Sequence, residues 1–249
     1  MVDISANLAR LRDAIAAAAH SVERDPEEIK LVAVSKTHPV ESIEAALAAG
    51  QRAFGENVIQ EALPKIAHFG GSDRLAATGA AVAAIPEWHF IGHLQSNKVR
   101  FVPGNFSWIH SIDSLKVAQR LSRFAREHGT PINALIEVNV AHDPRKHGVA
   151  PDTVTALLDQ LSQQDLPGVT FRGLMTIGPY PASEADIRRA YAALRRLRDD
   201  CARRFALKTF TELSMGMSGD YVEAIKEGAT LLRIGTAIFG ERSYRESAR

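Results

Sequence analysis

Short apolar runs typical of buried strands alternate with amphipathic helical segments along almost the whole of this 249-residue chain. The first complete example is the run KLVAVS at residues 30–35, followed by a helical segment that opens after Pro39 and ends before Gly50. Strands that alternate with helices in this way are joined by right-handed crossovers and form a parallel sheet. We predict eight such strands, at residues 30–35, 52–55, 88–92, 108–112, 132–140, 169–177, 209–214 and 231–239.

Eight strand-helix units in about 250 residues fit a closed (β/α)8 barrel of the TIM type better than an open doubly wound sheet. An extra amphipathic helix over residues 4–15 precedes the first strand. The strands at 52–55 and 88–92 are short, and a chain without them would form a seven-unit or open sheet, which is the alternative. Because no linker-like composition divides the chain, we expect residues 1–249 to form a single domain.

Two connections of the predicted barrel have distinct composition. Residues 94–101 are predicted to form the helix between the third and fourth strands. Residues 70–86 are poor in large apolar side chains and rich in Ala and Gly, so we expect a long surface loop there. A mobile lid is the functional alternative for that loop.

Composition narrows the classes of partner and compartment. The formal net charge is +1 and there is no basic tail, which disfavours nucleic acid and anionic membranes as partners. The lone cysteine, Cys201, excludes an intrachain disulfide and a multi-cysteine metal site and fits a reducing compartment. We see no signal peptide and no run of 18 apolar residues, so we expect a cytoplasmic protein.

The chemistry of a parallel barrel lies at the carboxyl ends of its strands, and Lys36 directly follows the first strand. An amine at the barrel mouth is partly desolvated, which lowers its pKa and leaves it able to attack a carbonyl. Lys36 is therefore a candidate Schiff-base lysine, bonded either to a cofactor aldehyde or to a substrate. The structural alternative is a lysine whose stem lies along the strand end and whose amine reaches solvent.

The last two strand ends carry glycines and hydroxyls suited to phosphate binding. Ser214 and Ser218 flank a glycine-containing segment after the seventh strand, and Gly235 and Thr236 follow the eighth. Barrels often bind phosphate in this region through backbone N–H groups. The glycines could equally serve only to make tight turns.

Two further patterns have both structural and functional interpretations. Arg233 lies within an apolar strand, where a buried guanidinium requires an acceptor, either a structural carboxylate or a ligand atom. His89 and His93 have the spacing of a helical metal site, but they fall on a predicted strand and no glutamate completes a motif. We therefore predict no metal.

Six ordered segments give the chain a specific resemblance to the pyridoxal-phosphate homeostasis protein family, the single-domain relatives of the alanine racemase N-terminal barrel. The resemblance spans residues 4–242, and the segment at 70–86 is longer than the family pattern. The segments are residues 32–37 (VAVSKT), 54–57 (FGEN), 88–98 (WHFIGHLQSNK), 173–175 (GLM), 213–218 (LSMGMS) and 233–240 (RIGTAIFG).

The resemblance implies pyridoxal 5'-phosphate as cofactor and a role for each matching residue. Lys36 would hold the cofactor aldehyde as a Schiff base, Asn57 would lie beside the ring, and Arg233 would face the pyridine nitrogen. Because arginine keeps its proton, that nitrogen would stay unprotonated and the ring would be a weaker electron sink. The cofactor phosphate would be bound by Ser214, Gly235 and Thr236, with Met215 behind them.

The resemblance also implies a function in vitamin B6 and amino-acid homeostasis, with the protein holding the cofactor without robust turnover. A low-activity amino-acid racemase is the second hypothesis, and a cofactor-free aldolase that uses Lys36 directly is the third. Two-base racemases take their second base from an additional C-terminal domain of a partner, and this sequence ends at Arg249. We therefore expect a monomer, with at most transient contact with apo-enzymes that use the cofactor.

Overall fold

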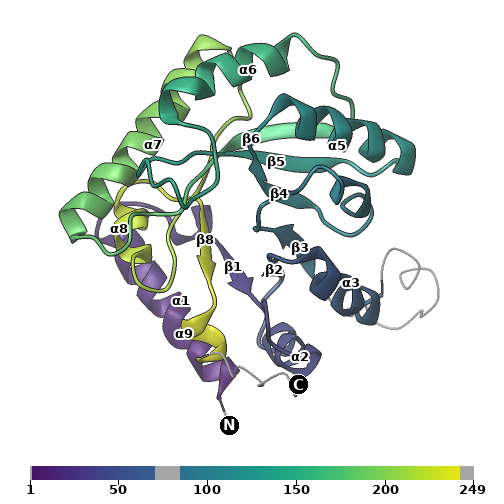
Figure 1. Ribbon diagram of the computed structural model, residues 1–249. Helices are drawn as coiled ribbons and strands as arrows, with labels where there is room; N and C mark the ends of the chain where they lie inside the picture. The colour runs from purple at the N-terminus through teal and green to yellow at the C-terminus, as the bar shows by residue number, and fades with distance from the viewer. Residues whose placement is uncertain (1, 71–84, 242–249) are drawn as a thin grey trace.

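The protein folds as a closed barrel of eight parallel strands in the order β1 to β8 (Figure 1), and the predicted (β/α)8 architecture is confirmed. The computed structural model describes residues 2–70 and 85–241. The hydrogen-bonded register closes between the first and last strands, where Val32 pairs with Arg233. The strands are β1 (Lys30–Val34), β2 (Ala53–Glu56), β3 (Glu87–Phe90), β4 (Trp108–Ile112), β5 (Ile132–Glu137), β6 (Val169–Met175), β7 (Glu212–Ser214) and β8 (Leu231–Ile234).

Helices surround the barrel on its outer face (Figure 1). The extra N-terminal helix is present and packs against the first crossover helix and the last two helices of the chain. Its first turn is capped by the Asp3 carboxylate, which accepts from the Ala6 N–H at 2.9 Å. The α-helices are α1 (Ile4–His20), α2 (Val40–Ala48), α3 (Ile59–His68), α5 (Leu115–His128), α6 (Val154–Ser162), α7 (Glu184–Arg204), α8 (Tyr221–Lys226) and α9 (Thr236–Phe239).

Two apolar layers hold the barrel together. The larger layer lies between the strands and the helices and includes Phe54, Ile109 and Tyr191, all fully buried. Because side chains alternate along a strand, the other set of strand residues faces the barrel interior. That interior set forms a second, smaller apolar cluster of Val32, Ala53, Leu135, Met175 and Leu231.

Several predicted boundaries are wrong, for local reasons. Residues 94–101 form turns and the short 3-10 helix η2 (Val99–Phe101) instead of a crossover helix. The fifth and eighth strands end three and five residues earlier than predicted, at Glu137 and Ile234, and Gly235 opens α9. Because β5 ends early, the carboxylate of Glu137 lies at the barrel mouth. Most of the predicted loop at residues 70–86 lies outside the described residues.

The strands run so that their carboxyl ends meet at one mouth of the barrel, where the loops from β1, β2, β5, β7 and β8 converge. No helix in the two described stretches of the chain is long and apolar enough to cross a membrane.

Candidate functional site

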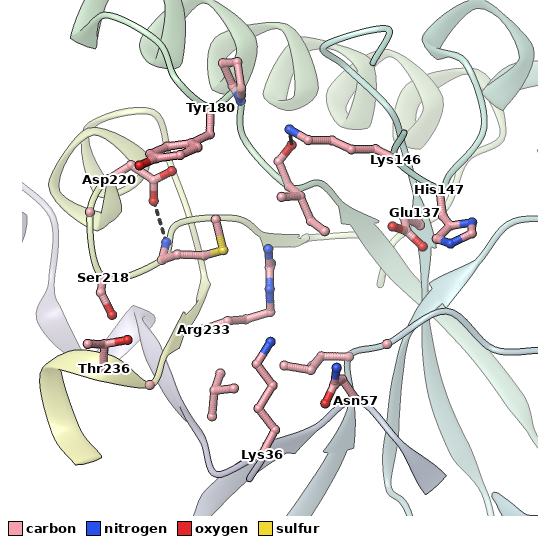
Figure 2. A pocket seen from close by; sticks show the side chains of 18 of the residues that line it. Lys36, Asn57, Glu137, Lys146, His147, Tyr180, Ser218, Asp220, Arg233 and Thr236 are labelled. Atoms are coloured by element: carbon pink, nitrogen blue, oxygen red, sulfur yellow. Dashed lines mark hydrogen bonds between the residues drawn. The ribbon is translucent and has the colours of Figure 1, made fainter. Parts of the chain in front are cut away.

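A cavity of about 650 Å³ opens at the carboxyl ends of the strands. That volume lies within the range of sites for small molecules and cofactors. Five of the seven predicted site residues line it, from the ends of β1, β2 and β8 (Figure 2). They are Lys36, Asn57, Arg233, Gly235 and Thr236.

A tight turn at the end of β1 presents Lys36 to the cavity. The His38 N–H donates to the Ser35 carbonyl at 3.1 Å, and Thr37 has a φ of 67°, the left-handed region that residues other than glycine adopt at a cost. Figure 2 shows the Lys36 side chain rising from this turn toward the Arg233 guanidinium. The position fits a lysine directed into the mouth, as predicted from the strand end.

A buried ion pair holds the same turn from behind. The Lys65 ammonium, on α3, donates to Glu56 Oε1 at 2.8 Å and to the Ser35 carbonyl at 2.9 Å. The Ser35 hydroxyl donates to the same Glu56 oxygen at 2.7 Å, while Glu56 Oε2 has no hydrogen-bond partner in the described part of the chain. Burial raises the pKa of Glu56 against the opposing charge of Lys65. The backbone of the Lys36 turn is thus tied to α3 through a charged group.

We predict that Lys65→Met destabilises the fold by about 3–5 kcal/mol at neutral pH, because it leaves a buried carboxylate without its counter-charge. Urea unfolding monitored by circular dichroism measures the loss. The deficit should shrink toward low pH, where protonated Glu56 carries no charge, and in the double variant Lys65→Met/Glu56→Gln. A deficit below about 1 kcal/mol, the range of an exposed ion pair, would contradict this account.

Arg233 is a buried cation whose described hydrogen bonds go to neutral oxygens. Its guanidinium donates to Ser214 Oγ at 2.7 Å and to the Thr176 carbonyl at 2.8 Å. Burial lowers the pKa of Arg233, and the nearby charges of Tyr191, Asp220 and Glu137 oppose that shift. The structural alternative of a hydrogen-bonded carboxylate is therefore not found among the described contacts. The guanidinium also lines the cavity, as a ligand-binding cation would.

Ser214 and Met215 do not line the cavity. The Ser214 side chain is fully buried and is bonded to Arg233 and to His110, whose Nδ1 lies 2.8 Å from Oγ. Met215 is a fully buried member of the outer apolar layer. Because β7 ends at Ser214, the residues that reach the mouth come a few positions later along the chain.

Ser218 and Gly219 occupy the wall of the cavity next to the start of α9. Figure 2 shows the Ser218 and Thr236 side chains on the same side of the cavity, one from each of the last two strand loops. Asp220 holds this loop, because its carboxylate accepts from the Met217 N–H at 2.5 Å and from the Tyr191 hydroxyl at 2.8 Å. In the sequence, the glycine-containing segment with Ser218 after the seventh strand was the feature that indicated this part of the cavity wall.

Glu137 is a cavity residue that the sequence analysis missed. It is the last residue of β5, is almost completely buried, and its Oε2 has no hydrogen-bond partner among the described residues. Burial raises the pKa of Glu137 to about 7, although the charge of Arg233 opposes the shift. The prediction that the strand continued to residue 140 placed this carboxylate inside a strand instead of at its end.

We predict that Glu137 makes the fold less stable as pH rises from about 4.5 to about 7. Because the pKa of Glu137 is higher in the folded chain, the unfolded chain is the first to lose the carboxyl proton as pH rises. The free energy of unfolding therefore falls across this window and levels off once the folded chain has also ionised. The full effect is on the order of 3 kcal/mol, since one pKa unit corresponds to about 1.4 kcal/mol. Chemical unfolding between pH 4 and pH 8 measures it.

Glu137→Gln should flatten that segment of the pH profile and be more stable than the unmodified chain at pH 8. The matched control is Glu127→Gln on the surface of α5, which should keep the original profile. Identical profiles for the Glu137 variant and the unmodified chain would show that Glu137 titrates normally.

Sequence and structure comparisons define the class of protein to which this barrel belongs. The model of the family described as "Alanine racemase, N-terminal domain" matches residues 6–243. The chain belongs to this family and, within it, to the pyridoxal phosphate homeostasis proteins. The pyridoxal phosphate homeostasis protein of Escherichia coli (strain K12) is 45% identical over 98% of this chain and 99% of its own length. That of Pseudomonas aeruginosa is 44% identical over 98% of both chains.

A solved relative carries the same fold with its cofactor. PipY of Synechococcus elongatus PCC7942, with PLP bound, is 39% identical to this chain, with a TM-score of 0.80, and the match covers 95% of this chain and all of PipY. Alanine racemase of Clostridium difficile 630 is 14% identical with a TM-score of 0.68, and the match covers 56% of that enzyme. At that identity the likeness concerns the fold alone.

Proposed function

We propose that this protein binds pyridoxal 5'-phosphate in the cavity at the barrel mouth and acts in vitamin B6 and amino-acid homeostasis as a carrier without robust turnover. The observation that supports it most is the placement of Lys36 and Arg233 in one cavity, in a chain 45% identical to a pyridoxal phosphate homeostasis protein. Lys36 would hold the cofactor through its amine, and a bound cofactor would supply the aldehyde for that attachment, with water as the leaving group.

The cavity residues fit such a group. A Cβ atom placed on Gly219 would meet no protein atom within 4 Å, so this part of the cavity wall is open to a bound phosphate. A Cβ on Gly235 would lie 3.0 Å from the Val34 carbonyl oxygen, so glycine at this position lets the start of α9 pass close to the end of β1 beside the cavity. The Ser218 and Thr236 hydroxyls add donors, while Asn57 lines the opposite part of the cavity.

The chain's own residues favour holding the cofactor over turning it into an electron sink. The Arg233 guanidinium does not give up its protons, so a ring nitrogen facing it remains an acceptor. Ser214, which does not line the cavity, helps to orient Arg233 because its Oγ accepts a hydrogen bond from the guanidinium. We accordingly assign phosphate binding to Gly235, Thr236 and Ser218, and the orientation of Arg233 to Ser214.

A low-activity racemase is the second candidate, and Glu137 is the observation that favours it. Its pKa of about 7 and its unpartnered Oε2 suit a group that accepts or donates a proton near neutrality. Exchange of the amino-acid Cα proton with deuterium from solvent separates the two functions: a carrier gives no exchange above the rate of free cofactor, whereas a racemase exceeds it.

We predict that Lys36→Ala abolishes covalent attachment of the cofactor while the barrel remains folded. The substitution removes the amine and little packing, because the side chain projects into the cavity. Incubation with pyridoxal 5'-phosphate, borohydride reduction and peptide mass mapping should locate a pyridoxyl adduct on Lys36 in the unmodified chain. An unmodified chain without an adduct would contradict cofactor attachment, and a variant that unfolds like a core mutant would contradict the assigned role of Lys36.

Thr236→Val tests the phosphate site. Replacing the hydroxyl by a methyl group removes a hydrogen bond to a charged group, a loss of about 1.5–3 kcal/mol, or roughly 10- to 150-fold in affinity. Equilibrium titration followed by cofactor absorbance measures the change. Thr236→Ser is the matched control, since it keeps the hydroxyl and should bind within a few-fold of the unmodified chain. Equal affinity for the valine variant would remove Thr236 from the site.

The proposal also includes a cytoplasmic, monomeric protein that contacts cofactor-dependent apo-enzymes transiently. The nearly balanced charge of the chain supports the absence of nucleic-acid and membrane partners. The free cysteine, Cys201, which is buried on α7, is consistent with a reducing compartment. Sedimentation velocity tests the monomer, and transfer of cofactor to an apo-enzyme at varied enzyme concentration tests direct contact.

A further inference from the structure

A continuous chain of hydrogen bonds crosses the interior of the barrel and ends at Arg233. It involves side chains from β3, β4, β7 and β8, which face one another across the barrel. Its successive links are Glu87 Oε1 to His89 Nε2 at 2.6 Å, His89 Nδ1 to His110 Nε2 at 2.9 Å, His110 Nδ1 to Ser214 Oγ at 2.8 Å, and Ser214 Oγ to Arg233 at 2.7 Å.

The two ends of this chain lie in different environments. Glu87 is the first residue of β3, at the end of the barrel opposite the cavity, and its side chain is 36% exposed. There it also accepts from the Lys30 ammonium at 2.9 Å. His89, His110 and Ser214 are fully buried, and Arg233 reaches the cavity. The chain therefore connects a surface carboxylate with the buried cation of the site.

The donors and acceptors fix the direction of every link. Arg233 can only donate, so Ser214 Oγ accepts from it and has its own hydrogen to give to His110 Nδ1. A neutral His110 then carries its proton on Nε2 and donates it to His89 Nδ1. His89 in turn carries its proton on Nε2 and donates to the Glu87 carboxylate. The opposite tautomers would place the bare Nε2 of His89 against Glu87, two acceptors 2.6 Å apart.

Electrostatics favours neutral imidazoles in this arrangement. Burial lowers the pKa of His110 well below its ordinary value, and the charge of Arg233 acts in the same direction. Burial also lowers the pKa of His89, although Glu87 opposes the shift. Burial raises the pKa of Glu87, but its interactions with His89 and Lys30 outweigh that effect and hold the pKa at about 2. Ionised Glu87 is therefore the terminal acceptor.

We infer that His89 and His110 are positioning residues that act through Ser214 to fix the orientation of the Arg233 guanidinium. The chain does not carry protons into the cavity, because it ends at an arginine, which keeps its protons. Its effect is to hold Ser214 Oγ as an acceptor for Arg233, while the Thr176 carbonyl accepts from the other guanidinium nitrogen. The part of this inference that concerns the cofactor rests on the proposed function.

The direct test is the tautomeric state of the two histidines in the cofactor-free protein. Long-range ¹H–¹⁵N correlation spectra of ¹⁵N-histidine-labelled protein at pH 7.5 should show both His89 and His110 protonated on Nε2 alone. Single His→Gln variants at His89 and His110 assign the signals. A proton on Nδ1 of either ring, or an imidazolium, would overturn the directional chain whatever the protein binds.

The positioning role is tested with His110→Phe, which keeps a ring but removes both nitrogens. Pyridoxal 5'-phosphate should bind up to about tenfold more weakly, as expected when a neutral hydrogen bond that orients Ser214 is lost, and the absorption maximum of the bound cofactor should shift. His110→Asn carries an oxygen where histidine carries Nδ1, so it can still accept from Ser214 and should recover most of the affinity and the original absorption.

Ser111→Ala is the matched control on the same strand. Its side chain is buried and its Oγ has no hydrogen-bond partner among the described residues, so removal of the hydroxyl should leave cofactor affinity and absorption unchanged.

Wild-type affinity and absorption in His110→Phe would overturn the positioning role. If the unmodified chain itself fails to bind the cofactor, the proposed function fails, and the tautomer spectra still decide the hydrogen-bond chain. If His110→Phe does not fold, His110→Gln takes its place, because its amide reaches the position of Nε2 and leaves Ser214 without the Nδ1 acceptor. The positioning role stands if the glutamine variant binds the cofactor more weakly, with a shifted absorption, and falls if it matches the unmodified chain.

Discussion

The burial of one positive charge, the Arg233 guanidinium, determines how the interior of this barrel is filled. Barrels of this type are usually packed with layers of branched aliphatic side chains. Here the barrel also contains an aliphatic cluster that includes Val32 and Leu135. Buried histidine and serine side chains, linked by hydrogen bonds that end at Arg233, cross the same interior. A buried guanidinium without acceptors would cost several kcal/mol, so the polar filling and the arginine depend on each other.

A second buried charge system supports the turn that carries Lys36. Lys65 and Glu56 do not line the cavity, yet they fix the Ser35 carbonyl and hence the turn that carries Lys36. The amine and the guanidinium are therefore both positioned by residues behind the cavity wall. Sites of this kind hold their geometry because the supporting residues are themselves packed and hydrogen-bonded. The mouth can stay open to solvent without losing its shape.

The sequence predicted the barrel well because hydrophobic period and strand count are local properties of the chain. It also predicted Lys36, Asn57, Arg233, Gly235 and Thr236 as cavity residues. The end of β7 was predicted correctly at Ser214, but the sequence does not show that this buried side chain is bonded to His110 and Arg233 instead of lining the cavity. Glu137 was missed because β5 ends three residues earlier than predicted.

The links across the barrel could not be predicted from sequence at all. His110 and Ser214 are separated by 104 residues and meet only because β4 and β7 face each other in a closed sheet. Each residue has an ordinary local explanation by itself, a histidine or a serine in an apolar strand. Their shared function becomes visible only when the register brings their polar atoms within hydrogen-bond distance.

A racemase on this fold needs cavity groups that remove and return a substrate proton, whereas a carrier does not. Alanine racemase shares the barrel at 14% identity, so the fold by itself does not decide the activity. Arg233 opposes carbanion chemistry because it cannot protonate a ring nitrogen. Among the described cavity residues, Glu137 is a carboxyl whose pKa of about 7 suits proton transfer near neutrality. The protonation of Glu137 is therefore a physical property on which the distinction between a carrier and a racemase depends.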